Sequence, residues 1–266
     1  MSDFVVRDLR AGYGGERVID GLSFSLKKGC IMGVLGANGS GKTTLIRAIC
    51  GIVRHTGECL LEGVPLEGLS PRQLARRCSY IPQRSGISLD MPVVDVVLMG
   101  FNPQLRLLEH PTEDMKKQAL AALEQVGLAG LGEKNYMHLS EGQKQLCILA
   151  RTLVTPGRLL LLDEPESALD FHFRYRMLEI IRRWVRKEER MALIALHDPM
   201  LALNDCDELL LLKDGRGLGV LRPQTDSFEK MEALLSLLYG SVSLTACTDR
   251  RGRRHIIMLN EGGGPV

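Results

Sequence analysis

The residues with the clearest chemical use lie at 36–43, where glycines, a lysine and a hydroxyl follow the spacing G-x-x-x-x-G-K-[ST]. Glycines there let backbone N–H groups converge on phosphate oxygens, and the N-terminus of a following helix adds positive potential. We expect Lys42 to contact the β- and γ-phosphates of a nucleotide and Thr43 to hold Mg²⁺. The candidate nucleotide ligands in this stretch are Gly36, Ala37, Asn38, Gly39, Ser40, Gly41, Lys42, Thr43 and Thr44. The alternative is a glycine-rich turn without a ligand, which the lysine and the hydroxyl disfavour.

Two carboxylates, Asp163 and Glu164, follow the unbroken apolar run 159–162. Four consecutive leucines without alternation indicate a strand covered on both faces, as in a parallel sheet between helices. Open α/β sheets bind ligands at the carboxyl ends of such strands, so we expect both acids near the nucleotide. The alternative is that they only cap the next helix.

Three further candidates follow predicted strands or turns. His197 comes after the apolar run 191–196 and would share the sheet edge with the two acids. Gln83 comes after a strand that stops at a proline, where a polar side chain can face a ligand. Tyr13 precedes a double glycine and could stack on a base. The other interpretations are a structural histidine, a solvated glutamine and a packed turn tyrosine.

The elements that must position these residues alternate between strand and helix. Strands are predicted at 4–13, 18–26, 31–35, 57–65 (ending in a turn), 79–83 (stopping at its proline), 158–163, 191–196, 207–213, 242–247 and 255–259, and helices after 41 and 70 and at 93–98, 112–126, 140–153, 171–190 and 228–238. Residues 89–155 have helical periodicity only, and Ser140 to Gln143 fit a capping box. The pattern predicts an α/β fold with a mixed sheet, an antiparallel β subdomain and an inserted α-helical subdomain.

Composition excludes several classes of protein. Of 266 residues, 34 are basic and 32 acidic, so the net charge of +2 gives no bulk attraction to nucleic acid or anionic lipid. The arginine-rich tip 250–254 lacks interleaved aromatics, and we expect no nucleic-acid partner. Seven scattered cysteines without a C-x-x-C pair indicate reduced thiols. We expect neither a signal peptide nor a spanning helix.

Taken in order, these segments resemble the ATP-binding subunit of an ABC transporter across almost the whole chain. Leu139–Gln143, with the sequence LSEGQ, is similar to the signature LSGGQ of that family. The phosphate loop, Gln83, the signature, the acidic strand end, the segment 167–170 and His197 occur in the family's order. The resemblance implies the P-loop ABC ATPase fold and ATP hydrolysis with Mg²⁺.

The resemblance also implies a role for each candidate residue. Tyr13 would stack on adenine, and Asp163 would orient Mg²⁺ through water. Glu164 would position or deprotonate the attacking water, His197 would touch the γ-phosphate, and Gln83 would sense metal and water. The signature residues Ser140, Gly142 and Gln143 would reach a nucleotide held by a second copy. Hydrolysis would therefore need a homodimer with nucleotides in its interface.

Two residues depart from the family pattern. Glu141 replaces the first signature glycine, and its carboxylate would repel a phosphate unless it points away. Glu166 stands where Thr or Ser is common. Because the signature serine, its second glycine and Glu164 are retained, we expect an active enzyme.

Softer matches favour one branch of the family. Val97–Pro103, His197–Leu203 and Leu238–Gly240 resemble importers for iron–siderophore complexes, haem and cobalamin, although relatives for molybdate or tungstate share much of this pattern. The resemblance implies membrane permease partners, an external substrate-binding protein, and a cytoplasmic place on the inner face of the cell membrane. Residues 84–105 would contact the permease, and we expect apolar side chains there, such as Met91, Val93, Val94 and Phe101, to be exposed.

We expect one ABC ATPase domain over 1–266, with a nucleotide-binding core at 1–87 and 157–225, a helical subdomain at 88–156, and a C-terminal helix and hairpin at 226–266. A soluble ABC-type ATPase acting on nucleic acid or ribosomes is an alternative, but it would need a coiled-coil insertion or a second cassette. A P-loop kinase or GTPase would share only the phosphate loop, and no N-K-x-D sequence is present.

Overall fold

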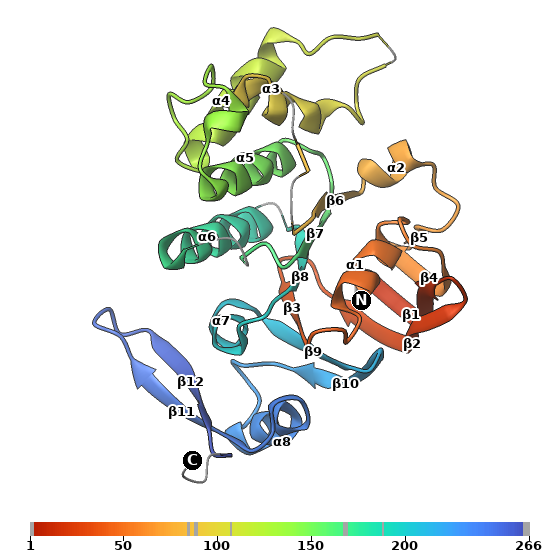
Figure 1. Ribbon diagram of the computed structural model, residues 1–266, viewed down its shortest axis with the longest axis vertical. Helices are drawn as coiled ribbons and strands as arrows, with labels where there is room; N and C mark the ends of the chain where they lie inside the picture. Colours follow the sequence, from red (N-terminus) through yellow and green to blue (C-terminus); the bar gives the residue numbers. More distant parts are fainter. Residues whose placement is uncertain are drawn as a thin grey trace.

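A computed structural model describes residues 3–83, 86–87, 90–106, 108–166, 170–187 and 189–262. Its centre is a six-stranded sheet in the order β10-β9-β3-β8-β7-β6 (Figure 1). The strands are β3 (Ile31–Leu35), β6 (Cys78–Ile81), β7 (Leu159–Asp163), β8 (Met191–Ala195), β9 (Glu208–Lys213) and β10 (Arg216–Leu221). All neighbours are parallel except β10, which is antiparallel to β9. The carboxyl ends of five strands therefore meet at one edge of the sheet.

Both faces of this sheet are buried because alternate residues of its strands belong to different cores. Leu160 and Leu162 of β7 pack into a core that includes the α-helices on one side, whereas Leu159 and Leu161 pack into a second core with the N-terminal strands. All five residues of β7 are buried. The unbroken run of leucines is thus explained by a strand that has no solvent-facing side.

The second core is closed by an antiparallel sheet in the order β2-β1-β4-β5 and by helix α1, which Figure 1 shows on the same side of the central sheet. These elements are β1 (Phe4–Tyr13), β2 (Glu16–Leu26), α1 (Lys42–Ile49), β4 (His55–Leu61) and β5 (Val64–Pro65). The predicted strand ending in a turn over 57–65 corresponds to β4, which ends at Leu61, and Glu62 and Gly63 take positive φ values that turn the chain into β5. Helix α2 (Pro71–Ala75) begins with the expected Ser70 cap, which forms a full capping box with Gln73.

A group of helices forms the upper part of Figure 1. It contains α3 (Val93–Leu98), η1 (Met99–Phe101), α4 (Glu113–Gln125), η2 (Tyr136–His138) and α5 (Glu141–Leu153). The expectation that apolar residues after Gln83 would be exposed is wrong for Val93, Val94 and Phe101, which are at most 2% exposed. Helix α3 packs against α4 and α5, so Val93 and Val94 fill the helical core, while Phe101 is buried in η1.

The remaining elements are α6 (Phe171–Lys187), α7 (Pro199–Asp205), α8 (Phe228–Tyr239), β11 (Val242–Thr248) and β12 (Arg254–Asn260). Helix α6 is shorter than the predicted 171–190, because Glu189 has a φ of 49° and the Arg190 N–H bonds back to Val185 O. The Arg190 guanidinium then lies 4.3 Å from the centre of the Trp184 ring. Helix α7, capped by Asp198, and strand β10 were not predicted.

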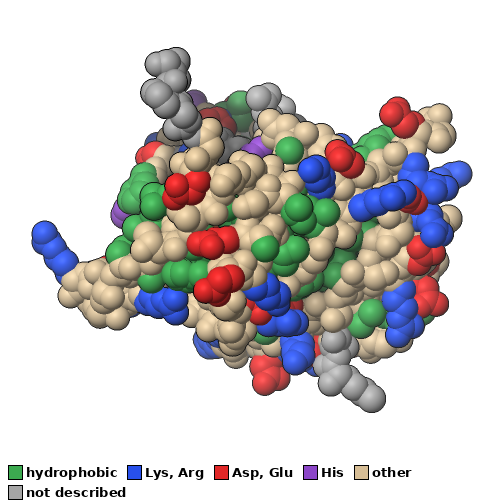
Figure 2. Space-filling model, turned by 90° about the horizontal axis from the view of Figure 1, so that it is seen from below, with side chains coloured by type: hydrophobic (Ala, Val, Ile, Leu, Met, Phe, Trp, Pro, Cys, Tyr) green, Lys and Arg blue, Asp and Glu red, His purple; other side chains and the backbone are tan. Residues whose placement is uncertain are grey.

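Seen from the end of the molecule that carries the hairpin, cationic and anionic side chains are interspersed, and the hairpin protrudes at the left (Figure 2). This face therefore carries no surface of a single charge sign. Among the described residues, the helices are too short or too polar to cross a membrane.

Candidate active site

The phosphate loop connects β3 to α1 at the carboxyl edge of the sheet. Gly41 has a φ of 104°, which only glycine adopts readily, and a Cβ on Gly36 would lie 2.3 Å from Leu212 O. Gly41 caps α1 without a side-chain hydrogen bond, so no side chain covers the first-turn N–H groups. The loop is thus shaped for a close-lying anion.

Lys42 is 4% exposed, and its Nζ donates to the carbonyl oxygens of Gly36 at 2.8 Å and Ala37 at 3.3 Å. The Oγ of Ser40 is buried and has no hydrogen-bond partner among the described residues. A buried polar atom without a partner is costly unless a ligand supplies one. A cavity of about 210 Å³ opens here. It is lined by Val18, Asn38, Gly39, Ser40, Gly41, Lys42, Thr43, Thr44 and Glu164.

The candidate metal ligands Thr43 and Asp163 are in contact. The Thr43 hydroxyl donates to Asp163 Oδ1 at 2.8 Å. Burial raises the pKa of Asp163, and the charge of Glu164 adds to this effect, while the Thr43 hydroxyl opposes it. A cation beside Asp163 would oppose this shift and favour the ionised form.

Glu164 is the residue on which three other candidates converge. Its Oε2 lies 2.7 Å from His197 Nε2 and accepts from Gln83 Nε2 at 3.2 Å, and its Oε1 lies 3.5 Å from Lys42 Nζ. These residues follow β7, β8, β6 and β3, so the parallel sheet edge brings together side chains that are far apart in the sequence. Glu164 itself has a φ of 49°, a left-handed conformation that is uncommon for residues other than glycine.

Glu166, the residue that replaces the common Thr or Ser, is 2% exposed and lies behind this cluster. Its Oε1 accepts the backbone N–H of His197 at 2.9 Å, while its Oε2 has no hydrogen-bond partner within the described part of the chain. Burial raises the pKa of Glu166, although the His197 N–H opposes the shift. Glu166 therefore anchors the backbone of the histidine that contacts Glu164. The neighbouring 167–169 lie outside the described residues.

Sequence reasoning missed Arg47 and Tyr80. The Arg47 guanidinium donates to the hydroxyls of Tyr80 and Tyr13, and these bonds raise the pKa of Arg47. The Tyr80 hydroxyl in turn bonds to Asp163. The Tyr13 ring, which is 48% exposed, is therefore tied by its hydroxyl to the helix that carries Thr43. The i, i+4 spacing of Thr43 and Arg47 on one helix face was the available signal.

The signature segment forms the start of α5. Ser140 Oγ accepts the N–H of Gln143 at 3.3 Å, and Gln143 Oε1 accepts the N–H of Ser140 at 3.1 Å, which is the expected capping box. Glu141 Oε1 lies 2.8 Å from Lys144 Nζ, so its charge is partly balanced within α5. A Cβ on Gly142 would lie 3.2 Å from the Phe173 ring. None of these signature residues lines the phosphate-loop cavity of the same chain.

A parallel sheet edge with a phosphate loop, a hydrogen-bonded Thr–Asp pair and a buried glutamate is typical of a nucleoside-triphosphate-binding α/β protein of the P-loop class. Residues 19–167, more than half of the chain, match the family model described as ABC transporter, and the chain belongs to this family. It is an ABC-type ATPase, as the sequence resemblance implied.

Relatives with assigned names extend the match beyond the family model. The chain is 35% identical to the cobalamin import ATP-binding protein BtuD of Halobacterium salinarum, over 98% of this chain and 69% of the relative. It is 37% identical to the hemin import ATP-binding protein HmuV of Bordetella pertussis, over 83% of this chain and 86% of the relative. A solved structure described as a metal-chelate type ABC transporter in an inward-facing conformation shares the fold. Its TM-score is 0.82 at 24% identity, over 98% of this chain and 99% of that chain.

Proposed function

We propose that this chain is the ATP-hydrolysing subunit of an importer for a metal chelate, such as an iron–siderophore complex, haem or cobalamin. The observation that carries the hydrolytic role is the convergence of Lys42, Gln83 and His197 on the carboxylate of Glu164. The cargo class is supported by the names of relatives that align over most of the chain.

The triphosphate of ATP would lie in the phosphate-loop cavity. The first-turn N–H groups of α1 and the unpartnered Ser40 hydroxyl would receive phosphate oxygens there. Lys42 would exchange its bonds to the Gly36 and Ala37 carbonyls for bonds to the β- and γ-phosphates. Tyr13, held in place through Arg47, would stack on the adenine.

Thr43 and Asp163 fit a magnesium ion, because hydroxyl and carboxylate oxygens are the hard ligands that Mg²⁺ prefers. When bound, Mg²⁺ supplies charge neutralisation to the phosphates. Thr43 would hold it directly and Asp163 through water, while Gln83 would sense the ion and the attacking water.

Glu164 would orient or deprotonate the water that attacks the γ-phosphate, and His197 would contact that phosphate. Phosphoryl transfer requires mainly positioning and charge stabilisation, and the strand ends hold these groups in fixed places. Glu166 would keep His197 in reach by holding its backbone N–H.

Ser140, Gly142 and Gln143 would complete the site of a second copy in a nucleotide-dependent homodimer. This is supported by their absence from the lining of the phosphate-loop cavity in their own chain. The same dimer would dock on permease subunits at the inner face of the cell membrane, with an external binding protein delivering the cargo. In this scheme 88–156 is the helical subdomain, 1–87 with 157–225 is the nucleotide-binding core, and 226–266 is a C-terminal addition.

Reconstitution tests this function. The chain would be combined with a candidate permease in liposomes, and phosphate release and uptake of labelled haem, cobalamin and ferric siderophore would be measured with molybdate as the comparison. We expect Mg²⁺-dependent hydrolysis that the loaded binding protein stimulates, together with uptake of one chelate. Hydrolysis stimulated by nucleic acid or ribosomes, without any permease effect, would contradict the transport role.

A further inference from the structure

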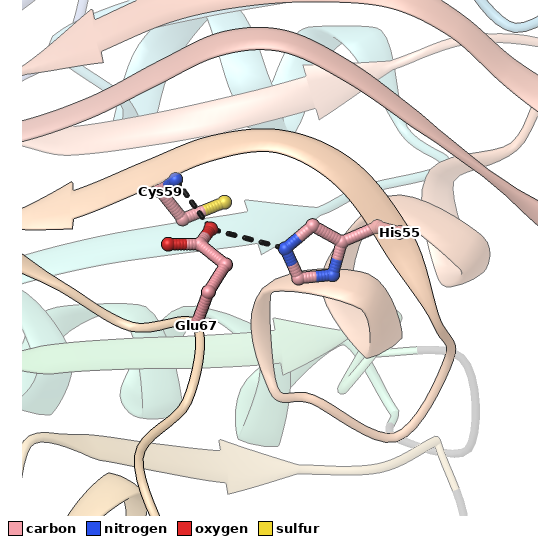
Figure 3. Close-up of side chains that lie close together, drawn as sticks. All are labelled: His55, Cys59 and Glu67. Atoms are coloured by element: carbon pink, nitrogen blue, oxygen red, sulfur yellow. Dashed lines mark hydrogen bonds and ion pairs between the residues drawn. The ribbon is translucent and has the colours of Figure 1, made fainter.

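Outside the nucleotide site, one cluster joins three different metal-ligand types. His55 and Cys59 belong to β4, and Glu67 follows β5. A ring nitrogen of His55, the sulfur of Cys59 and a carboxylate oxygen of Glu67 all lie within 4.8 Å of one another. Figure 3 shows the histidine ring and the sulfur both directed toward the carboxylate. None of the three lines the phosphate-loop cavity.

A bend in β4 brings the first two residues together. In a regular strand, residues four apart have Cα atoms about 13 Å apart, which is four rises of about 3.3 Å. Between them, Gly57 has a φ of 94°, and Asp8 on the paired strand has a φ of 47°. The β1–β4 register shifts at this point, between Arg7 and Arg10. The cluster is therefore held by an irregularity that is built into the ladder.

The third residue is fixed by the loop after β5. The Leu66 N–H bonds to Cys59 O at 2.8 Å, which lays the loop on β4. Glu67 Oε1 accepts the Cys59 N–H at 2.6 Å and lies 3.1 Å from His55 Nε2. Cys59 is fully buried, whereas the Glu67 side chain is 34% exposed, so the cluster has an inner and a solvent-facing side.

The buried Cys59 thiol is influenced by the negative charge of Glu67. Burial raises the pKa of the Cys59 thiol, and the negative charge of Glu67 raises it further. Burial opposes ionisation of Glu67 as well, but hydrogen bonds from His55 and backbone N–H groups outweigh this effect and lower its pKa. The Cys59 sulfur and a Glu67 carboxylate oxygen lie within 4.8 Å of each other, so a cation between them would contact both groups.

We propose that His55, Cys59 and Glu67 form a binding site for a divalent cation of the Zn²⁺ class. A thiolate, an imidazole nitrogen and a carboxylate are donors that Zn²⁺ prefers, and water at the solvent-facing side would complete four ligands. On binding, the Cys59 S–H bond breaks, its proton passes to solvent, and a sulfur–metal bond forms without oxidation or reduction. The thiolate, the carboxylate and the divalent cation together have zero net charge, so the occupied site would carry no net charge.

Cobalt titration of the nucleotide-free full chain tests the site, because a Co²⁺–thiolate bond has a near-ultraviolet charge-transfer band that a site without thiol cannot give. We expect that band at one Co²⁺ per chain, with release of one proton. Zn²⁺ should then displace Co²⁺, because thiolate, imidazole and carboxylate ligands in a four-coordinate site suit Zn²⁺. Cys247→Ser removes an exposed cysteine and is the matched control that should keep the band.

Two variants decide the outcome. Cys59→Ser should abolish the band, and His55→Gln should weaken Co²⁺ binding by at least about tenfold, since even outer-shell substitutions commonly cost that factor. Circular dichroism establishes whether each variant is folded. If Cys59→Ser does not fold, the Co²⁺ affinity of His55→Gln alone tests the proposal. A folded parental chain without the thiolate band would overturn the proposal. So would a band that persists at unchanged affinity in His55→Gln.

Discussion

Thr43 and Asp163, 120 positions apart in the chain, are joined by a 2.8 Å hydrogen bond at the carboxyl edge of the central sheet. Thr43 lies in the first turn of α1, and Asp163 is the last residue of β7. The proposed function makes this pair the place where Mg²⁺ is held, and the contact already sets the two oxygens side by side.

Asp163→Asn should raise the Mg²⁺ concentration needed for half-maximal ATP hydrolysis by about tenfold or more, because the amide removes the negative charge. Thr43→Ser keeps the hydroxyl and should stay close to the parental requirement. Phosphate release measured over a range of Mg²⁺ concentrations checks both variants. An unchanged requirement in Asp163→Asn would exclude it from the metal site.

Glu164→Gln should reduce ATP hydrolysis by about 10²- to 10⁴-fold, the usual contribution of a positioned general base, while ATP still binds. A dimer should then accumulate with ATP and Mg²⁺ on size-exclusion chromatography. Glu179→Gln is the control, because Glu179 lies exposed on α6 and pairs with Arg183. Hydrolysis by Glu164→Gln at the parental rate would refute the assignment of the base.

Glu166 should make stability depend on pH. Burial raises the pKa of Glu166 in the folded chain above its ordinary value of 4.5. The folded state then binds more protons than the unfolded state, so this stabilisation is full below pH 4.5 and is lost as pH rises through the folded pKa.

Glu166→Gln removes this titration and retains an acceptor for the His197 N–H. The free energy of unfolding of Glu166→Gln, relative to that of the parent, should therefore increase between about pH 4 and pH 8. This range begins near the ordinary pKa of a carboxyl group. Denaturant unfolding at several pH values measures the difference. A constant difference across that range would contradict the shift.

Glu141 should be tolerated in the signature because Lys144 balances it. An exposed ion pair contributes about 0.2–1 kcal/mol, so Glu141→Gln should change ATP hydrolysis by less than about fivefold. Lys144→Met leaves the carboxylate unbalanced and should reduce hydrolysis more than Glu141→Gln does. The double variant should recover toward Glu141→Gln. If Lys144→Met has no effect on ATP hydrolysis, the ion pair with Lys144 is not what makes Glu141 tolerable in the signature.

Gly57→Ala should destabilise the β1–β4 pair. The methyl group would lie 2.4 Å from Asp8 O, and the φ of 94° is costly for alanine, so we expect a loss of about 2 kcal/mol or more. Gly63→Ala is the matched control, because Gly63 also has a positive φ but nothing lies within 4 Å of its Cβ position. Thermal unfolding compares them, and equal losses would mean that backbone conformation alone accounts for the effect.

The sequence predicted candidate site residues where a polar residue stands at the end of an apolar strand. Asp163, Glu164 and His197 each follow an unbroken apolar strand, and parallel strands must bring such residues to one edge. Features that depend on three-dimensional packing could not be predicted. The Arg47 guanidinium meets tyrosines from two other strands, and the register shift beside Gly57 that brings His55 to Cys59 leaves no periodic signal.

The same reasoning explains the wrong expectation for the segment after Gln83. Apolar residues such as Val93 and Phe101 fit both an exposed docking patch and a helical core, and only the positions of α4 and α5 decide between them. The end of α6 was likewise set by a residue with positive φ, Glu189, whose type does not predict that conformation.

Beside the phosphate loop, the charges of Lys42 and Arg47 are offset by the carboxylates of Asp163 and Glu164, so these side chains leave no excess positive charge for a nucleotide. ATP with its magnesium ion adds negative charge. The helix N-termini of α1 and, in the proposed dimer, α5 of the second copy each present about half an elementary positive charge toward it. Attraction between the bound nucleotide and these positive helix ends would thus favour the closed dimer. In the proposed dimer, loss of phosphate would weaken this attraction between the copies, so hydrolysis would favour opening.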